Sequence, residues 1–487
     1  MRKSVIVIGS GIAGLASAIR LTKKGHIVSV FEANHYPGGK LTEIKLGKYR
    51  FDAGPSLFTL PEEIESLYEL CGLNAKDYFN YEQLSTTCKY FYADGTEIEA
   101  FADEEAFSKE VETKTGEPAK NIRAALDKSQ FLYEELAPLF MHKSLHKAST
   151  WLSAEAIKRY TKLTKFDFGR TMDHANTSRF KSEKVVQLFN RYATYNGSDP
   201  YQAPGTMNII PHLEFGIGAY FPKKGMYDIT KSLYELAKKV GVQFYFDTPV
   251  EKITVFEGAA KGVDTKFGFH KADRIVSNMD IVGTYEKLLK SQPRPSKIID
   301  QPKSSSALIF YWGIKKEFKQ LDLHNIFFSS NYKSEFEHIF QKGTIIDDPT
   351  VYINITAKKK ADDAPEGCQN WFTMINVPNN QGQDWDLLIK EARVNILKKL
   401  SQQLGEDIEP LIEVEDVLDP RSIELRTSSS QGALYGNSSN NKYAAFLRHA
   451  NFSTKIEHLY FCGGSVHPGG GIPLCLLSAK IVADNFA

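Results

Sequence analysis

The chain has 487 residues, with 60 Lys and Arg against 59 Asp and Glu, so its formal net charge is +1. At about 100–200 residues per domain, this length predicts several structural units that bury a large core without disulfides. Five cysteines with no paired metal-ligand spacing argue against a disulfide framework or a zinc site and favour a reducing compartment. The balanced charge gives no overall attraction for nucleic acid, so we expect no nucleic-acid partner.

The apolar run 5–21 resembles a membrane or export segment only at first sight. Three glycines and Arg20 interrupt it, and it is shorter than the ~20 apolar residues that span a bilayer. No other window reaches that length. The sequence therefore predicts a soluble or peripheral protein with no transmembrane helix and no export signal.

The first thirty residues predict a dinucleotide-binding unit. Ser4–Ile8 is a β-branched run typical of a buried parallel strand, and the turn Gly9-Ser10-Gly11-Ile12-Ala13-Gly14 follows it. A helical pattern over 15–24 and a second strand over 27–31 come next. In such a unit the first glycine permits a tight turn, the second lets the backbone approach a pyrophosphate, and the third lets the helix pack on the strand.

Two further features support this interpretation. Glu32 ends the second strand, where a carboxylate can accept hydrogen bonds from ribose hydroxyls. The turn Gly38-Gly39-Lys40 then stands where an NAD domain would have a crossover helix. Its amides and its positive charge could reach the same pyrophosphate or ribose, and a solvated hairpin turn is the alternative.

A third glycine loop lies near the other end of the chain. A strand is predicted over 456–462, and the segment 463–473 holds five glycines and two prolines before a helix over about 474–486. A second helix N-terminus would therefore be available for an anionic or electron-rich group.

These motifs, taken with other blocks in the same order, resemble the FAD-dependent carotenoid desaturases, the phytoene desaturase group. The further blocks are Phe51–Ser56, Arg191–Pro200, Tyr220–Met226, Pro249–Ile253, Ile275–Asp280 and Cys462–Lys480. The resemblance implies FAD contacts at Gly9, Gly11, Ile12, Ala13, Gly14, Glu32, Lys40, Ser56, Leu57, Val250 and Asn278. It implies contacts on the isoalloxazine side at Gly464, Gly471, Ile472 and Pro473. Val250 is expected to end a strand over 242–250 and to pair its backbone with the adenine edge.

Because these residues come from both chain ends and from the middle, the cofactor domain must be discontinuous. We expect an α/β fold with a Rossmann-type FAD-binding domain, similar to amine oxidases and GDP-dissociation inhibitors, built from 1–70, 222–290 and 418–487. Segments 71–221 and 291–417 would form a mixed α+β substrate domain. Its helical part, about 104–186, is predicted to associate with a membrane.

The membrane prediction rests on a local charge excess. Between positions 141 and 170 there are seven Lys and Arg against two Asp and Glu, interleaved with apolar side chains. A basic, aromatic-bearing helix pair suits a membrane interface at ~1 kcal/mol per basic residue, and a solvated face over an apolar core is the alternative. The carotenoid implied by the resemblance would enter from a bilayer. We therefore expect a cytoplasmic protein at the inner face of the membrane.

The resemblance implies desaturation by hydride transfer to FAD, with oxygen or a quinone as the final electron acceptor. The substrate would be an acyclic, 1-hydroxylated carotenoid end group, desaturated between C3 and C4. Asp167 and Arg170, spaced i, i+3, match an acid/base pair of the family, and a surface ion pair or helix cap is the alternative. Alternative functions are phytoene desaturation, carotenoid cis–trans isomerisation, and non-enzymatic lipid binding as in the GDP-dissociation inhibitors.

Overall fold

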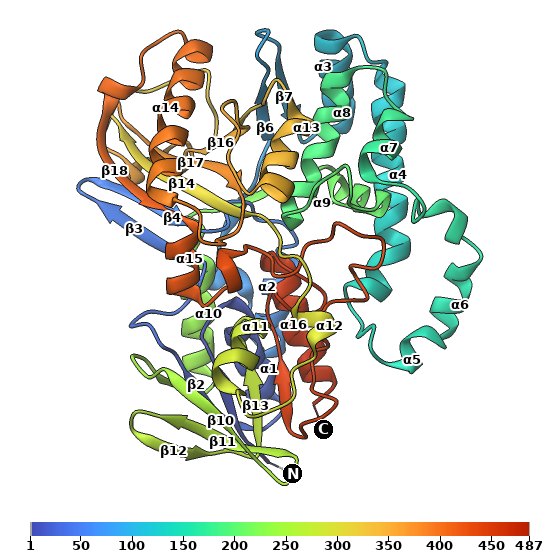
Figure 1. Ribbon diagram of the computed structural model, residues 1–487, viewed down its shortest axis with the longest axis vertical. Coiled ribbons are helices and arrows are strands. Elements are labelled where there is room, and N and C mark those ends of the chain that lie inside the picture. The colour runs from blue at the N-terminus through green and yellow to red at the C-terminus, as the bar shows by residue number, and fades with distance from the viewer. Residues whose placement is uncertain (1, 487) are drawn as a thin grey trace.

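The computed structural model describes residues 2–486 and shows two large sheets at opposite ends of the molecule (Figure 1). The first sheet is five-stranded and parallel, in the order β19-β13-β1-β2-β9. Its strands are β1 (Ser4–Ile8), β2 (Ile27–Phe31), β9 (Gln243–Tyr245), β13 (Arg274–Ser277) and β19 (Leu459–Phe461). Three distant parts of the chain thus meet in one sheet. The domain boundaries themselves stay a prediction.

Alternation along β1 explains how this sheet is covered on both faces. Val5 and Val7 pack into the core formed with α1 (Ile12–Lys23), α10 (Tyr227–Lys239) and α16 (Ile472–Asp484). Ile6 and Ile8 point to the other face, into a core that includes the antiparallel sheet β10–β12. Those strands are β10 (Val250–Phe256), β11 (Ala259–Thr265) and β12 (Gly268–Lys271). An apolar strand that is buried on both faces is what the continuous run at the N-terminus predicts.

The predicted strand over 242–250 is wrong. The parallel strand β9 ends at Tyr245, Asp247 has a positive φ of 51°, and Val250 begins the antiparallel strand β10. Pro249 lacks a backbone N–H and cannot continue a ladder, so the chain turns before it. Val250 therefore opens a strand of the second layer and does not end one of the first.

The second large sheet has seven strands in the order β18-β14-β17-β16-β15-β6-β7, of which only the β15–β6 pair is parallel. The strands are β6 (Thr86–Phe91), β7 (Glu97–Phe101), β14 (Ser306–Ile314), β15 (His324–Phe327), β16 (Val351–Asn354), β17 (Gln369–Val377) and β18 (Ile412–Leu418). Leu308 and Phe310 of β14 pack in the core with α14 (Trp385–Leu404), whereas Ala307 and Ile309 point to the opposite face. That opposite face borders the cavity described below.

Helices fill the region predicted to be helical. They include α3 (Glu104–Thr115), α4 (Ala119–Phe140), α5 (Ala148–Trp151), α6 (Ala154–Tyr160), α7 (Met172–Thr177) and α8 (Glu183–Asn190). In Figure 1, α5 and α6 project to one side of the molecule, beyond both sheets. Across residues 2–486, no helix combines the length and the apolar character needed to cross a bilayer.

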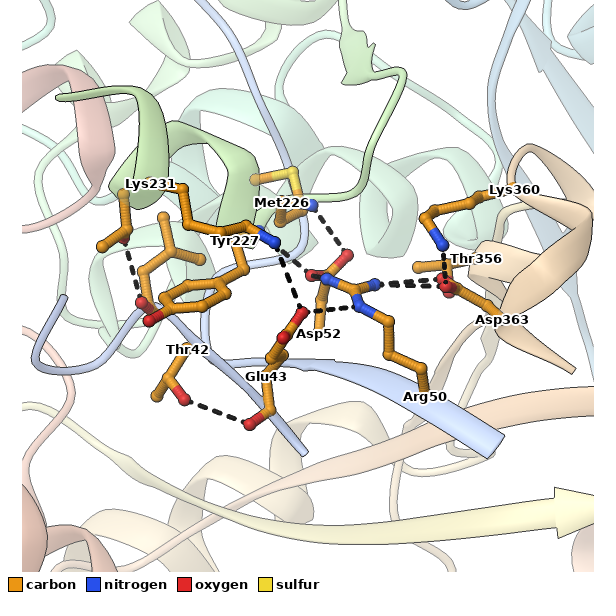
Figure 2. Close-up of polar contacts among 12 residues, drawn as sticks. Thr42, Glu43, Arg50, Asp52, Met226, Tyr227, Lys231, Thr356, Lys360 and Asp363 are labelled. Atoms are coloured by element: carbon orange, nitrogen blue, oxygen red, sulfur yellow. Dashed lines mark hydrogen bonds and ion pairs between the residues drawn. The ribbon is translucent and has the colours of Figure 1, made fainter. Parts of the chain in front are cut away.

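A buried ion-pair network, shown in Figure 2, joins the two halves of the fold. Arg50 lies in β4 (Tyr49–Ala53), which pairs with β3 (Thr42–Leu46) beside the seven-stranded sheet. Its guanidinium contacts Glu43 at 2.7 Å, Asp52 at 2.7 Å and Asp363 at 3.1 Å. Although burial disfavours its charge, Asp52 and Asp363 raise the pKa of Arg50 above its ordinary value.

Asp52 extends this network to α10, one of the helices that cover the parallel sheet. Its carboxylate accepts hydrogen bonds from the backbone N–H groups of Met226, at 2.7 Å, and Tyr227, at 3.0 Å, at the start of α10. A carboxylate at a helix N-terminus satisfies free N–H groups and complements the helix dipole. The turn that carries Ser56 follows four residues later, so its position relative to both sheets is set by this network.

Candidate functional site

A large cavity of about 1410 Å³ lies between the two large sheets. Loops of the parallel sheet and the inner face of the seven-stranded sheet border it. It exceeds the ~300–1,000 Å³ usual for a small-molecule site. Every predicted cofactor contact except Gly14 lines it. Those residues are Gly9, Gly11, Ile12, Ala13, Glu32, Lys40, Ser56, Leu57, Val250, Asn278, Gly464, Gly471, Ile472 and Pro473.

The first glycine turn is packed too closely for side chains. A Cβ on Gly14 would lie 2.2 Å from the Gly9 carbonyl oxygen, so the helix can approach the strand only with glycine there. A Cβ on Gly11 would lie 2.7 Å from Asn278 Oδ1, and that same oxygen accepts a hydrogen bond from the Gly14 N–H at 3.1 Å. Gly14 therefore supports the turn from behind, which explains why it does not line the cavity.

Two helix N-termini from opposite ends of the chain border the cavity. Gly11 is the N-cap of α1 and supplies no side-chain cap, so the backbone N–H groups of Ile12 and Ala13 can donate hydrogen bonds to an anion. Gly471, with a φ of 103°, is the N-cap of α16 and also lacks a side-chain cap. A Cβ there would meet no atom within 4 Å, so the position is open. We call these two helix N-termini, at Gly11 and Gly471, the glycine cradle. Their free N–H groups and their lack of side chains suit a pyrophosphate and an electron-rich ring.

Glu32 is already surrounded by hydrogen-bond donors. One carboxylate oxygen accepts from the Ser10 N–H and hydroxyl, each at 2.7 Å, and the other accepts from the Asn34 N–H at 2.9 Å and side-chain amide at 3.0 Å. These four donors use the capacity of a carboxylate. A ribose hydroxyl would therefore replace one of the two side-chain donors, both of which can rotate. The sequence analysis did not identify Ser10 and Asn34 as the groups that orient Glu32.

Lys40 lines the cavity, but its charge is directed to the protein backbone. Its Nζ donates to the carbonyl oxygens of Ala433, at 3.2 Å, and Leu434, at 2.8 Å. Burial lowers the pKa of Lys40, and the carboxylate of Asp280 opposes that shift. The side chain is thus neither a free phosphate ligand nor part of a solvated hairpin. It ties the second glycine turn to a segment that is 393 residues away in the chain.

The structure does not bring Asp167 and Arg170 into the cavity. Asp167 has a positive φ of 58°, and its carboxylate pairs with Arg170 at 2.8 Å and with Lys128 at 3.6 Å. The cavity is lined instead by Phe168, which lies between them. The two residues form the i, i+3 ion pair of the alternative interpretation, although the Asp167 side chain is only 10% exposed and is therefore not at the surface.

Two clusters of polar side chains on the cavity wall contain residues that were not predicted to belong to the site. Tyr352 Oη lies 2.7 Å from Ser56 Oγ and 2.7 Å from His324 Nδ1, which forms a chain of three side chains. Arg191 pairs with Glu214 at 3.5 Å. Arg191 belongs to a sequence block used for the resemblance, whereas no local pattern marks His324 or Tyr352.

The chain has counterparts among known proteins along almost its whole length. The model of the family described as "Flavin containing amine oxidoreductase" matches residues 12–486. The chain belongs to this family. As a member it is an FAD-dependent oxidoreductase with the amine-oxidase type of fold, which confirms the predicted fold class, enzyme class and cofactor. The membrane-associating character of the helical part stays a prediction.

Two relatives and one solved structure illustrate the similarity. A 1-hydroxycarotenoid 3,4-desaturase of Flavobacterium sp. (strain P99-3) is 54% identical over 99% of this chain and 98% of its own. A 4,4'-diapolycopene oxygenase of Methylomonas sp. is 31% identical over 99% of this chain and 97% of its own. An oxidoreductase from Methanosarcina mazei has the same fold, with a TM-score of 0.64 at 15% identity over 99% of this chain and 100% of its own.

Proposed function

We propose that this protein is a carotenoid desaturase that forms the C3–C4 double bond beside a 1-hydroxylated acyclic end group. The observation that carries the proposal is the continuity of the cavity, which runs from the glycine cradle to apolar side chains of the seven-stranded sheet such as Ile309, Phe372 and Met374. A long polyene can lie along such a wall with one end at the cofactor. The 54% identical relative bears this activity in its name.

When bound, FAD would take up both hydrogens that are removed, a hydride from one of the two carbons that become doubly bonded and the proton that the other carbon loses. The chain's own residues would hold the polyene in place and exclude water from it. Asp167 is not proposed as an acid or base, since it lies outside the cavity lining. The electrons would then pass to oxygen or a quinone.

Product mass tests this function. We expect the yellow, FAD-loaded protein in liposomes to convert a 1-hydroxylated γ-carotene into a product lighter by two hydrogens. Phytoene as the preferred substrate would instead indicate a phytoene desaturase, and an unchanged mass would indicate an isomerase. An added oxygen would indicate chemistry like that named for the 31% identical relative.

We also propose a peripheral membrane contact through the surface around α5 and α6. Leu152 and Ile157 are 76% and 55% exposed there, and Tyr160 and Leu163 are exposed beside them. The basic side chains contribute less than their number suggests, because Lys143 pairs with Glu155, and Arg159 and Lys162 also pair with carboxylates. The exposed apolar groups therefore support the contact more than the net charge does.

This surface leads toward the cavity. A smaller apolar pocket of about 240 Å³ lies against it and is lined by Trp151, Tyr160 and Leu163. The same pocket shares Phe140 and Phe446 with the large cavity. A carotenoid that leaves a bilayer here would pass between aromatic side chains to reach the cavity.

Vesicle co-sedimentation tests the contact. Leu152→Asp combined with Ile157→Asp should reduce binding to anionic vesicles at least about tenfold, because each charge would have to enter the interface. Val394→Asp on α14 places the same charge at another exposed apolar position and serves as the control. If the Leu152→Asp, Ile157→Asp variant binds vesicles as well as the control and the wild type do, this surface is not the docking face.

A further inference from the structure

The wall of the large cavity carries a hydrogen-bonded chain of three side chains, Ser56, Tyr352 and His324. The chain ends at His324, whose second ring nitrogen has no hydrogen-bond partner among the described residues. His324 is the first residue of β15 and lies opposite Asn354 of the neighbouring strand β16. Its side chain is buried and lines the cavity on the inner face of the seven-stranded sheet. Its Nδ1 contacts Tyr352 Oη at 2.7 Å and Asn354 Nδ2 at 3.2 Å. Its Nε2 is buried and has no hydrogen-bond partner within residues 2–486.

The neighbours of His324 determine which nitrogen carries its proton. Burial lowers the pKa of His324 to about 4, so the ring is neutral near pH 7, with Asp322 and Arg191 as the nearby charges. The Asn354 amide nitrogen can only donate, so Nδ1 accepts and the proton lies on Nε2. The ring therefore holds a buried N–H donor that lacks an acceptor. Leaving such a donor unpaired is unfavourable, and a bound acceptor would recover that loss.

We infer that His324 Nε2–H donates a hydrogen bond to the hydroxyl oxygen of the substrate end group and thereby selects hydroxylated carotenoids. Tyr352 and Ser56 position the ring from behind. This inference rests on the proposed function and names the group that would make it specific.

The position of the chain agrees with the chemistry of the substrate. In a 1-hydroxylated end group only C1 and C2 separate the hydroxyl oxygen from C3, the nearer reacting carbon. A group that recognises this hydroxyl must therefore lie beside the cofactor. Ser56 is a predicted cofactor contact on the cavity wall, and its hydroxyl is bonded directly to Tyr352.

The other polar cluster in the cavity already has internal partners. The Arg191 guanidinium lies over the rings of Tyr90, Tyr192 and Tyr195, at 4.4–5.2 Å from their centroids. Both carboxylate oxygens of Glu214 accept hydrogen bonds from tyrosine hydroxyls. The charge and the acceptors of this cluster are therefore satisfied within the protein, although Arg191 Nε, like His324 Nε2, has no hydrogen-bond partner within residues 2–486. His324 is the better candidate because Tyr352 links its ring to Ser56, the predicted cofactor contact.

Paired substrates test the inference. We would compare kcat/KM of the FAD-loaded protein in liposomes for a 1-hydroxylated carotenoid and for the same carotenoid without the hydroxyl. The wild type should prefer the hydroxylated substrate by about 10- to 100-fold. His324→Leu should remove most of that preference, whereas His324→Gln, whose amide can donate near the same position, should retain part of it.

Two tyrosine variants separate a positioning role from a general structural one. Tyr352→Phe removes the hydroxyl that holds His324 and should reduce the preference. Tyr311→Phe is the control, because Tyr311 belongs to the same sheet, has a buried hydroxyl with no hydrogen-bond partner within residues 2–486, and does not line the cavity. Flavin absorbance per protein would show that each variant retains its cofactor.

The outcomes distinguish the inference from the proposed function. A His324→Leu variant that keeps the wild-type preference overturns the inference, as does a wild type that desaturates both carotenoids equally well. A wild type that desaturates neither carotenoid overturns the proposed function. Binding titrations with the same two carotenoids then test His324 without turnover, and equal binding of both would overturn its selective role.

Discussion

Removal of Arg50 should cost more stability than removal of any surface arginine. Arg50→Met keeps a side chain of similar length but leaves Asp52 and Asp363, whose side chains are 1% and 0% exposed, without their shared cation. An uncompensated buried charge costs ~3–5 kcal/mol. Asp363 retains Lys360 at 2.7 Å, so we expect a loss at the lower end, about 3 kcal/mol.

Denaturant unfolding of the FAD-loaded protein, followed by tryptophan fluorescence and by flavin release, measures this loss. Arg393→Met is the control, because Arg393 makes comparable pairs with Glu409 and Glu415 at the surface and should cost less than about 1 kcal/mol. Asp52→Asn added to Arg50→Met should restore part of the stability, because Asp52 is the carboxylate that Arg50→Met leaves without a cation. An Arg50→Met protein as stable as the wild type, or no recovery in the double variant, would refute the reasoning.

Three further changes test the cofactor cradle and one buried carboxyl group. Gly14→Ala should abolish flavin retention, because its Cβ would lie 2.2 Å from the Gly9 carbonyl oxygen; a variant with wild-type flavin absorbance would contradict this. Glu32→Ala should weaken flavin retention in dialysis by releasing the donors of Ser10 and Asn34, and unchanged retention would reject that role. Burial raises the pKa of Glu335 from 4.5 to about 7, so its protonated form stabilises the fold at low pH and that stability is lost as the pH rises through 7. Glu335→Gln should therefore remove up to about 3 kcal/mol of the fall in unfolding free energy between pH 4.5 and 8, and an unchanged pH profile would exclude Glu335 as its source.

The sequence predicts the features of this fold that depend on local pattern. The strands Ser4–Ile8 and Ile27–Phe31 have the predicted bounds, because a short β-branched run beside a glycine turn has few other structures available. The C-terminal helix begins at Ile472, two residues before the predicted start, because Gly471 is its N-cap and Pro473 is favoured in its first turn. Glycine spacing thus predicts the two helix N-termini that form the cradle.

Features that depend on distant partners could not be predicted in the same way. The carbonyl partners of Lys40 lie 393 and 394 residues away, and Ser56 and Tyr352 are 296 residues apart. No period or spacing in a single sequence links such positions. Asp167 combines both situations. Local spacing correctly predicts its ion pair with Arg170, three residues away. Whether Asp167 lines the cavity depends on the whole fold, and it does not.

We propose that this protein binds its cofactor mainly through its backbone and selects its substrate through side chains. The cradle consists largely of backbone amides and glycines, so substitutions there act through main-chain geometry and should affect flavin retention with any carotenoid. The proposed hydroxyl site consists of side chains on β15 and β16, where the backbone is fixed by strand pairing and a side chain can change without moving it. Changes at His324 should therefore alter which carotenoid is accepted and leave the flavin bound, whereas changes at Gly14 should lose the flavin. If His324→Leu released the flavin as readily as Gly14→Ala does, this separation of functions would be wrong.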